Sequence, residues 1–182
     1  NGTQAILIST DNFIALAFRG TEATSLKDIK SDAKAVSIQC DSGGKVHCGF
    51  IAAFEEVAIE IQSTLNQEKF ANKPLFITGH SLGGALATIA AKKLTHQGGI
   101  ASCYTFGSPR VGDEKWISNI KVPFYRVVNA ADCVTMMPPS SVTISALSWL
   151  VSFIPQIGKS IRGLLLSKFG GYLHGGNMRY LT

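Results

Sequence analysis

One serine of this chain lies in a setting that would make it a nucleophile. Ser81 is the centre of Gly79-His-Ser-Leu-Gly83, a G-x-S-x-G pentapeptide. The apolar run 75–77 precedes it, and apolar residues at helical spacing follow it as far as Leu94. Strand, sharp turn and helix in that order are the context of a nucleophile elbow, in which glycines let the strand and helix backbones pass close together. The sequence therefore predicts a catalytic serine, the alternative being an ordinary glycine-serine turn.

A serine hydroxyl needs a base that accepts its proton and an acid that orients the base. On a sheet of this kind the chain order is serine, acid, histidine, which excludes His47 and His80. His96 precedes every plausible acid and lies at the end of the predicted helix, where a capping or solvent role fits better. His174, in a glycine-flanked loop, is left as the predicted base.

Two carboxylates in strand-end loops compete for the role of the acid. Asp113 follows the strand next to the elbow strand and precedes a helix, so its alternative role is an N-terminal helix cap. Asp132 follows the second strand after the elbow, where the acid of this architecture usually lies. Glu114 falls inside the predicted helix. We therefore predict Asp132 as the acid.

Backbone amides are the predicted donors to the charge that develops on an attacked carbonyl oxygen. The amide of Leu82 opens the helix after Ser81 and points at the developing oxyanion. Gly20-Thr21 follows an earlier strand, and the Thr21 amide is the predicted second donor, with its hydroxyl adding a hydrogen bond. The alternative for Thr21 is a cap on the polar helix that follows.

The elements that must hold these residues alternate between strand and helix. This alternation predicts a three-layer α/β domain with a mostly parallel central sheet and right-handed crossovers, and the length of 182 residues fits a single domain over 1–182. The predicted elements are a hairpin (5–8 and 13–18), a polar helix (25–36), a loop (39–45), an amphipathic helix (50–65), the elbow strand (75–77), a helix ending at 97–99, a strand (101–106), a short helix (112–120) and a strand (123–128).

Composition excludes several classes of function. A hydrophobic fraction of 46% with 16% charged residues fits a globular chain, and no Lys/Arg block is interleaved with aromatics, so we expect no nucleic-acid partner. The cysteines form no C-x-x-C pair, which argues against structural zinc; no metal and no organic cofactor is expected. Cys40 and Cys48 bracket a Gly-Gly turn and form either a disulfide or two free thiols. Cys103 and Cys133 complete the set.

Residues 142–169 are an unusually apolar segment ahead of His174. Pro155 interrupts the run, which is too short for a transmembrane helix. Two amphipathic helices that cover the active site or touch a lipid interface fit this pattern, and so does a helical insertion packed on the sheet. Both alternatives stay open.

Six segments together resemble the class 3 lipases, the fungal triacylglycerol lipases with their bacterial and plant relatives. The resemblance implies an α/β-hydrolase fold and ester hydrolysis through an acyl-enzyme. The segments are Phe18-Arg-Gly-Thr21, Val46-His-Cys-Gly-Phe50, Gly79-His-Ser-Leu-Gly-Gly84, Thr105-Phe-Gly-Ser-Pro-Arg-Val-Gly-Asp113, Asn129-Ala-Ala-Asp132 and Tyr172-Leu-His-Gly-Gly176.

Carried over residue by residue, the resemblance agrees with the elimination above. It implies Ser81 as nucleophile, Asp132 as acid, His174 as base, and Thr21 and Leu82 as oxyanion donors. It also implies a structural role for His47, which would hold the loop before the helix at Phe50.

The chain departs from the family pattern in three places. The family usually begins with a helix and further strands that precede the hairpin. Residues 25–32 are mostly polar where the family commonly has an apolar lid, and Cys133 follows the predicted acid where proline is common. We expect the apolar segment 142–169 to have taken over the role of a lipid-facing cover.

The expected function is a serine hydrolase that cleaves carboxylic esters, in the first place a triacylglycerol lipase. An esterase, or a phospholipase or galactolipase of the same family, is the alternative, followed by a non-catalytic lipid-binding relative. The expected partner is a lipid or ester substrate, and the oligomeric state stays open. Lipid substrates and closely spaced cysteines favour export from the cell, with a cytoplasmic location as the alternative.

Overall fold

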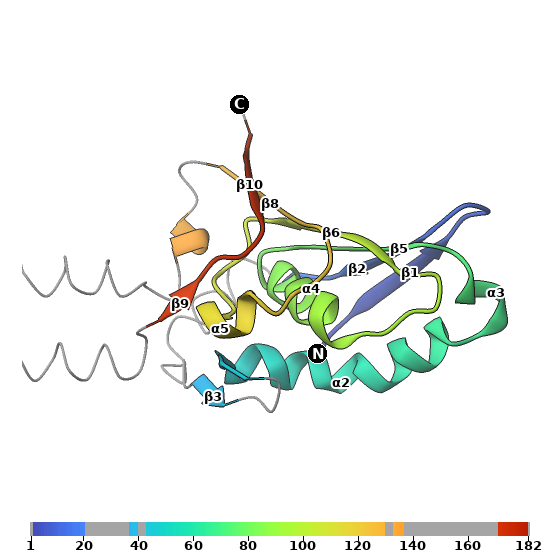
Figure 1. The fold of residues 1–182 in the computed structure, drawn as a ribbon, viewed down its shortest axis with the longest axis horizontal. Helices are drawn as coiled ribbons and strands as arrows, with labels where there is room; N and C mark the ends of the chain where they lie inside the picture. The colour runs from blue at the N-terminus through green and yellow to red at the C-terminus, as the bar shows by residue number, and fades with distance from the viewer. Residues whose placement is uncertain (1, 21–36, 40–42, 130–132, 137–170, 182) are drawn as a thin grey trace, which may run out of the picture.

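The computed structural model describes residues 2–20, 37–39, 43–129, 133–136 and 171–181 (Figure 1). Several of the predictions fall elsewhere in the chain. Thr21, the acid Asp132, the polar helix 25–36 and the apolar segment 142–169 lie outside the described residues.

A six-stranded sheet organises the described part of the chain. The first two strands form the predicted antiparallel hairpin, and every later neighbour pair is parallel. The mostly parallel central sheet predicted from the sequence is therefore confirmed. In spatial order the strands are β1 (Ala5–Ser9), β2 (Ile14–Phe18), β5 (Leu75–His80), β6 (Ile100–Phe106), β8 (Phe124–Val128) and β10 (Asn177–Tyr180).

A second, smaller sheet is antiparallel throughout and was not predicted. Two of its strands meet the predicted loop over 39–45 only at its end residues, Gln39 and Lys45, and a third replaces the start of the predicted helix over 112–120. Its strands have only two or three residues, too few for an alternating pattern to be read from the sequence. They are β3 (Ser37–Gln39), β4 (Lys45–His47), β7 (Gly112–Asp113) and β9 (Tyr172–Leu173).

The helices follow the predicted order with changed ends. They are α2 (Cys48–Leu65), α3 (Glu68–Ala71), α4 (Leu82–Lys93), α5 (Glu114–Ile117) and the 3-10 helix η1 (Cys133–Met136). The elbow helix α4 ends before 97–99, because Leu94 already has an extended backbone with ψ of 147°. The short α3 and η1 had no readable period.

Helix α4 is the centre of the core. It contacts β2, β5 and β6, and α2 packs against its other side (Figure 1). Nine consecutive residues of α4, from Gly83 to Ala91, are buried, and most of them are small. Small side chains let the helix lie close to the sheet, which fixes the position of Ser81 at its N-terminal end.

The opposite face of the sheet is not covered by any helix in the described part of the chain (Figure 1). From β1 to β10 each strand is added on the same side of the previous one, and right-handed crossovers in a single direction place all connecting helices on one face. Phe76, expected in a fully buried strand, is consequently only half-buried.

Candidate active site

Ser81 has a strained backbone at the junction of β5 and α4. Its φ of 54° and ψ of −123° make it the only non-glycine residue with positive φ in the described part of the chain. Its amide donates to the Phe106 carbonyl at 2.9 Å, and its own carbonyl accepts from the Gly84 amide at 2.9 Å. These bonds hold the sharp strand–turn–helix geometry that the sequence predicted around this serine.

Two glycines permit the close backbone contacts that this turn needs. A Cβ atom on Gly79 would lie 2.2 Å from the carbonyl oxygen of Gly83, a separation that real side chains do not reach. A Cβ atom on Gly20 would lie 2.6 Å from the His80 carbonyl oxygen and 3.6 Å from Cβ of Ser81. The end of the loop that leads to Thr21 therefore packs directly against the nucleophile elbow.

The hydroxyl of Ser81 is buried at the junction of β5 and α4. The side chain is buried, and Oγ has no hydrogen-bond partner among the described residues. The adjacent Leu82 is the first residue of α4, so its amide has no acceptor within the helix. A buried hydroxyl without a partner costs free energy in a purely structural site, which favours a functional reading of this position.

His174 lies in the loop between β9 and β10, half-buried, and its ring does not bond to Ser81. Nε2 instead contacts the carbonyl oxygen of Thr135, in η1, at 2.5 Å. Because a carbonyl only accepts, Nε2 carries the proton in this contact. Burial lowers the pKa of His174 from 6.5 to about 4, and nearby arginine charges add to that effect. The structure thus shows a neutral imidazole at His174 that is hydrogen-bonded to Thr135 and not to Ser81.

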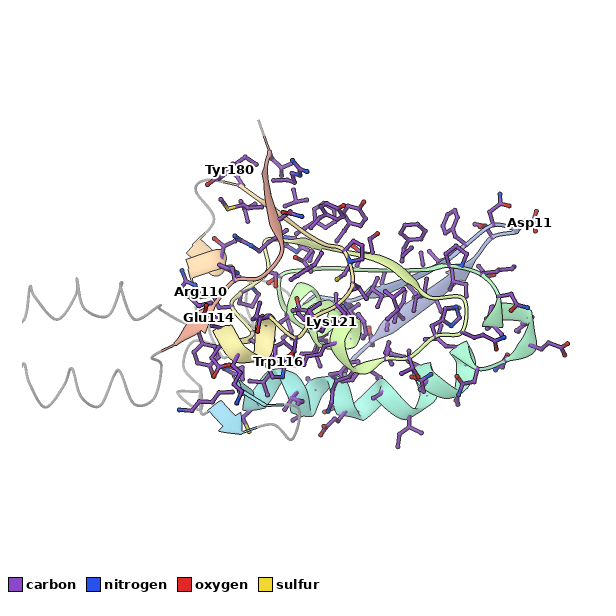
Figure 2. The ribbon with its side chains drawn as sticks, viewed as in Figure 1. Asp11, Arg110, Glu114, Trp116, Lys121 and Tyr180 are labelled. Atoms are coloured by element: carbon purple, nitrogen blue, oxygen red, sulfur yellow. The ribbon has the colours of Figure 1, made fainter. Side chains whose placement is uncertain are left out.

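The competing carboxylate, Asp113, has the structural role that was its alternative. Its Oδ1 accepts a hydrogen bond of 2.8 Å from the amide of Trp116, which caps α5. Trp116 itself is buried and labelled in Figure 2. Asp132 belongs to the segment between β8 and η1 and is outside the described residues, so its assignment as the acid stays a prediction.

Two of the three other histidines considered above, His47 and His96, have contacts that suit structural roles. The ring of His47 stacks on Phe50 with 4.1 Å between centroids, and burial lowers its pKa to about 4. His96 contacts the Lys73 carbonyl oxygen through Nε2 at 2.7 Å, so it joins two loops rather than capping α4.

Two arginines near His174 were not singled out by the sequence analysis. Arg110 and Arg126 both lower the pKa of His174 through their charges. Arg110 lies within the 105–113 motif, so its place in that motif could have drawn attention to it. No sequence motif includes Arg126, and its neighbours in space come from strands that are distant in the sequence.

Comparison with known proteins shows which family the chain belongs to. A family model described as lipase (class 3) matches residues 15–142. The chain belongs to the class 3 lipase family. Among relatives of this class 3 lipase chain, a secreted mono- and diacylglycerol lipase of Fusarium solani is 44% identical over 108 residues, 55% of this chain and 32% of the relative. A lipase of Rhizomucor miehei is 34% identical over 145 residues, 72% of this chain and 39% of the relative.

Solved lipase structures establish the α/β-hydrolase fold. A fungal lipase–inhibitor complex aligns with a TM-score of 0.72 at 28% identity, over 99% of this chain and 62% of the lipase. A triacylglycerol lipase described as having a serine-protease triad aligns with a TM-score of 0.70 at 28% identity, with the same coverage of 99% and 62%. The class 3 lipase chain thus spans less than two thirds of the proteins it matches.

Two further properties of the described residues bear on partners. No helix there has both the length and the apolar character needed to cross a bilayer. The same residues hold no cluster of three or more histidine, cysteine or acidic side chains suited to a metal ion. Cys48 and Cys103 carry free thiols, so for Cys48 the free-thiol alternative is the observed one.

Proposed function

We propose that this chain carries the catalytic centre of a lipid ester hydrolase, with triacylglycerol lipase as the first candidate. The observation that supports this most strongly is Ser81, whose positive φ and buried, unpartnered hydroxyl occur at the N-terminus of a twelve-residue helix. The family membership reported above supports the same reaction class. In this proposal the triad is Ser81, His174 and Asp132, with the oxyanion bound by the amides of Thr21 and Leu82.

The reaction proceeds in two acyl transfers. Oγ of Ser81 attacks the ester carbonyl carbon while His174 takes the hydroxyl proton, and the oxyanion is held by the two backbone amides. The bond to the alcohol oxygen breaks as His174 returns the proton to it, leaving an acyl-enzyme. Water then repeats the sequence and releases the carboxylic acid.

Catalysis requires a rearrangement around His174. Nε2 must leave the Thr135 carbonyl before it can accept a proton from Ser81. Since Ser81 is only 3% exposed, an ester also reaches Oγ only after overlying groups move. Both requirements fit an enzyme whose resting state differs from its working state.

The proposed substrate and the proposed export of the protein rest on its relatives and on the composition of the chain. Relatives are named secreted mono- and diacylglycerol lipases, which supports partial glycerides as substrates and export of this protein. The apolar composition of residues 142–169 supports contact with a lipid interface or a cover over the site. Deleting them should then lower activity on emulsions far more than on soluble esters, whereas an equal loss on both would refute that role.

Hydrolysis of p-nitrophenyl esters of increasing acyl length tests the proposal. Wild type should be active and Ser81→Ala inactive, while Ser102→Ala, which also removes a buried unpartnered hydroxyl, should keep its activity. Comparing tributyrin with phosphatidylcholine then separates a glyceride lipase from a phospholipase. Equal inactivity of wild type and Ser81→Ala would favour the lipid-binding alternative.

A further inference from the structure

Strand β1 is an outer strand of the six-stranded sheet, and part of its backbone points away from the sheet (Figure 1). At one end of the strand the amide of Arg19 donates to the Gln4 carbonyl at 2.9 Å, so the backbone of Gln4 faces β2. These directions alternate along an antiparallel strand. The backbone groups that face outward are therefore those of Ala5, Leu7 and Ser9.

This edge has none of the features by which proteins prevent unwanted strand pairing. The sequence of β1 is Ala-Ile-Leu-Ile-Ser, without proline and without a charged side chain. Its register with β2 contains no bulge, and no other described strand pairs with it. An apolar edge strand of this kind is a template for a further strand.

A cleft with a volume of about 310 Å³ lies between β1 and helix α2. Apolar side chains of the hairpin and of α2 form its walls, namely Leu7, Leu16, Val57 and Ile61. Leu7 and Val57 are only half-buried, so apolar surface remains open to an occupant. At an edge strand beside such a groove, backbone hydrogen bonds supply affinity for an added strand and the groove receives its alternate side chains.

The charge along this cleft is negative. Glu60 of α2 lines the cleft, is exposed, and forms no ion pair with a described residue. One turn earlier on α2, Glu56 accepts a hydrogen bond of 3.0 Å from the amide of Thr3, which also lines the cleft. Arg19 and Lys73, which bond to the hairpin, do not line it. A basic side chain on the occupant would therefore have an unpaired carboxylate beside it.

The same charges disfavour a second copy of this chain as the occupant. Two-fold pairing of β1 with β1 would bring the α2 helices of both copies to the same face of one continuous sheet. The carboxylates of Glu56 and Glu60 would then approach those of the other copy, and β1 has no basic side chain to offset the repulsion.

We propose that the edge of β1 and the adjoining cleft bind an extended peptide segment of a partner protein, apolar at alternate positions and carrying a basic side chain. The segment adds a strand to the sheet by bonding to the outward backbone groups of β1. Its apolar side chains enter the cleft, and its basic group pairs with Glu60. This inference does not depend on the function proposed above, because β2 separates β1 from the elbow strand β5.

The first test is fluorescence anisotropy with a labelled heptapeptide that has valine at every second position and one lysine. Saturable binding is expected. N-methylation of the two central amides should weaken binding by about tenfold or more, because one of two neighbouring amides must donate to β1. Absence of saturable binding below about 1 mM would overturn the inference, and so would equal binding of the N-methylated peptide.

A charge substitution on the protein tests the basic position. Glu60→Gln should weaken binding of the lysine peptide by about two- to fivefold, as expected for an exposed ion pair. Glu68→Gln is the matched control, since it removes an exposed carboxylate from α3 that does not line the cleft. Equal effects of the two variants, or no effect of either, would contradict the role of Glu60.

Backbone hydrogen exchange measured by NMR tests the register. The heptapeptide should slow exchange of the Leu7 and Ser9 amides by about tenfold or more and leave Ile6 and Ile8, which already face β2, nearly unchanged. Equal slowing along the whole strand, or none, would overturn strand addition. Slow exchange at Leu7 and Ser9 without peptide, in protein that sediments as a dimer, would identify a second copy as the occupant and overturn the inference.

Discussion

Ser81 is held in a conformation that the rest of the chain has to enforce. A positive φ at a residue with a side chain costs about 1–3 kcal/mol, and such positions concentrate at functional sites. Here the cost is offset by hydrogen bonds to Phe106 and Gly84 and by the close passage of glycines under the turn. Substituting Ser81 therefore tests the function of its hydroxyl, whereas substituting the glycines tests the packing that strains its backbone.

Gly79→Ala should destabilise the protein through backbone collision. The new Cβ would lie 2.2 Å from the Gly83 carbonyl oxygen, and backbone has little freedom to withdraw. We expect a loss of about 2–4 kcal/mol in the free energy of unfolding, measured by urea denaturation. Gly2→Ala is the matched control, because its Cβ would meet only a side-chain atom at 3.5 Å. Equal stability of the two variants would contradict this account.

Substitution of the two candidate acids should have different effects, one on stability and the other on activity. Asp113→Ala removes the cap of α5 and should cost about 1 kcal/mol of stability while hydrolysis continues. Asp132→Ala should lower kcat by a factor of about 10⁴ or more while the protein stays folded. Thermal melting and ester hydrolysis measure the two effects. The assignment is wrong if Asp113→Ala is the inactive variant.

At this scale, the sequence could predict a feature only where its residues lie close together along the chain. The elbow at Ser81 could be read because its strand, turn and helix are contiguous, and the cap at Asp113 because its partner is three residues away. The contact of His174 with Thr135 joins residues 39 positions apart, and Arg126 lies opposite Met178 only because β8 pairs with β10. No sequence pattern carries that information.

At the scale of elements, long periodic segments were predictable and short ones were not. The amphipathic pattern over 50–65 corresponds to α2 within two residues. Strands β7 and β9 have two residues each and exist because each finds a partner, β7 against β4 and both against each other. This small sheet ties the segment before His174 to the start of α2, so it positions the proposed base.

The junction of β4 and α2 makes stability depend on pH. The pKa of His47 is about 4 when folded against an ordinary value of 6.5, so the unfolded chain binds more protons between these values. Stability should be full above pH 6.5 and fall as pH drops toward 4, by about 1–3 kcal/mol after allowance for partial exposure. Chemical denaturation across this range measures it.

The matched variant for that prediction is His47→Phe. The phenyl ring can still stack on Phe50, and the backbone amide of residue 47 still donates to the Val111 carbonyl. The fall in stability between pH 6.5 and 4 should become shallower, with the contribution of His174 remaining. An unchanged slope would show that His47 does not titrate as inferred.

At the scale of the whole molecule, the six-stranded sheet of the described structure has one face covered by helices and one exposed face. The exposed face carries apolar side chains on β1, β2, β5, β6 and β8, including a stacked pair of tyrosines, Tyr104 and Tyr125, 5.0 Å apart. The order of strands explains why the connecting helices all lie on the other side. Local patterns predicted the longer strands and helices but could not reveal that the strand order never reverses.

This face should bind apolar dyes. Combining Ile6→Thr with Phe106→Ser removes side chains that are 62% and 41% exposed, and should lower the fluorescence of a bound naphthalene sulfonate dye. Their removal should change the free energy of unfolding by less than about 1 kcal/mol. Ile59→Ser on α2 is the control, since this residue is 84% exposed but stands alone. Equal dye binding in all variants would contradict the exposed face.

The most direct test of the central claim is labelling with a fluorophosphonate, followed by mass spectrometry to find the modified residue. An activated serine reacts with this probe, whereas a serine without a base does not. The account predicts labelling of Ser81 in native wild type, and its loss in His174→Ala and in heat-denatured protein. Labelling that persists in His174→Ala, or no labelling of native wild type, would contradict the proposed catalytic centre.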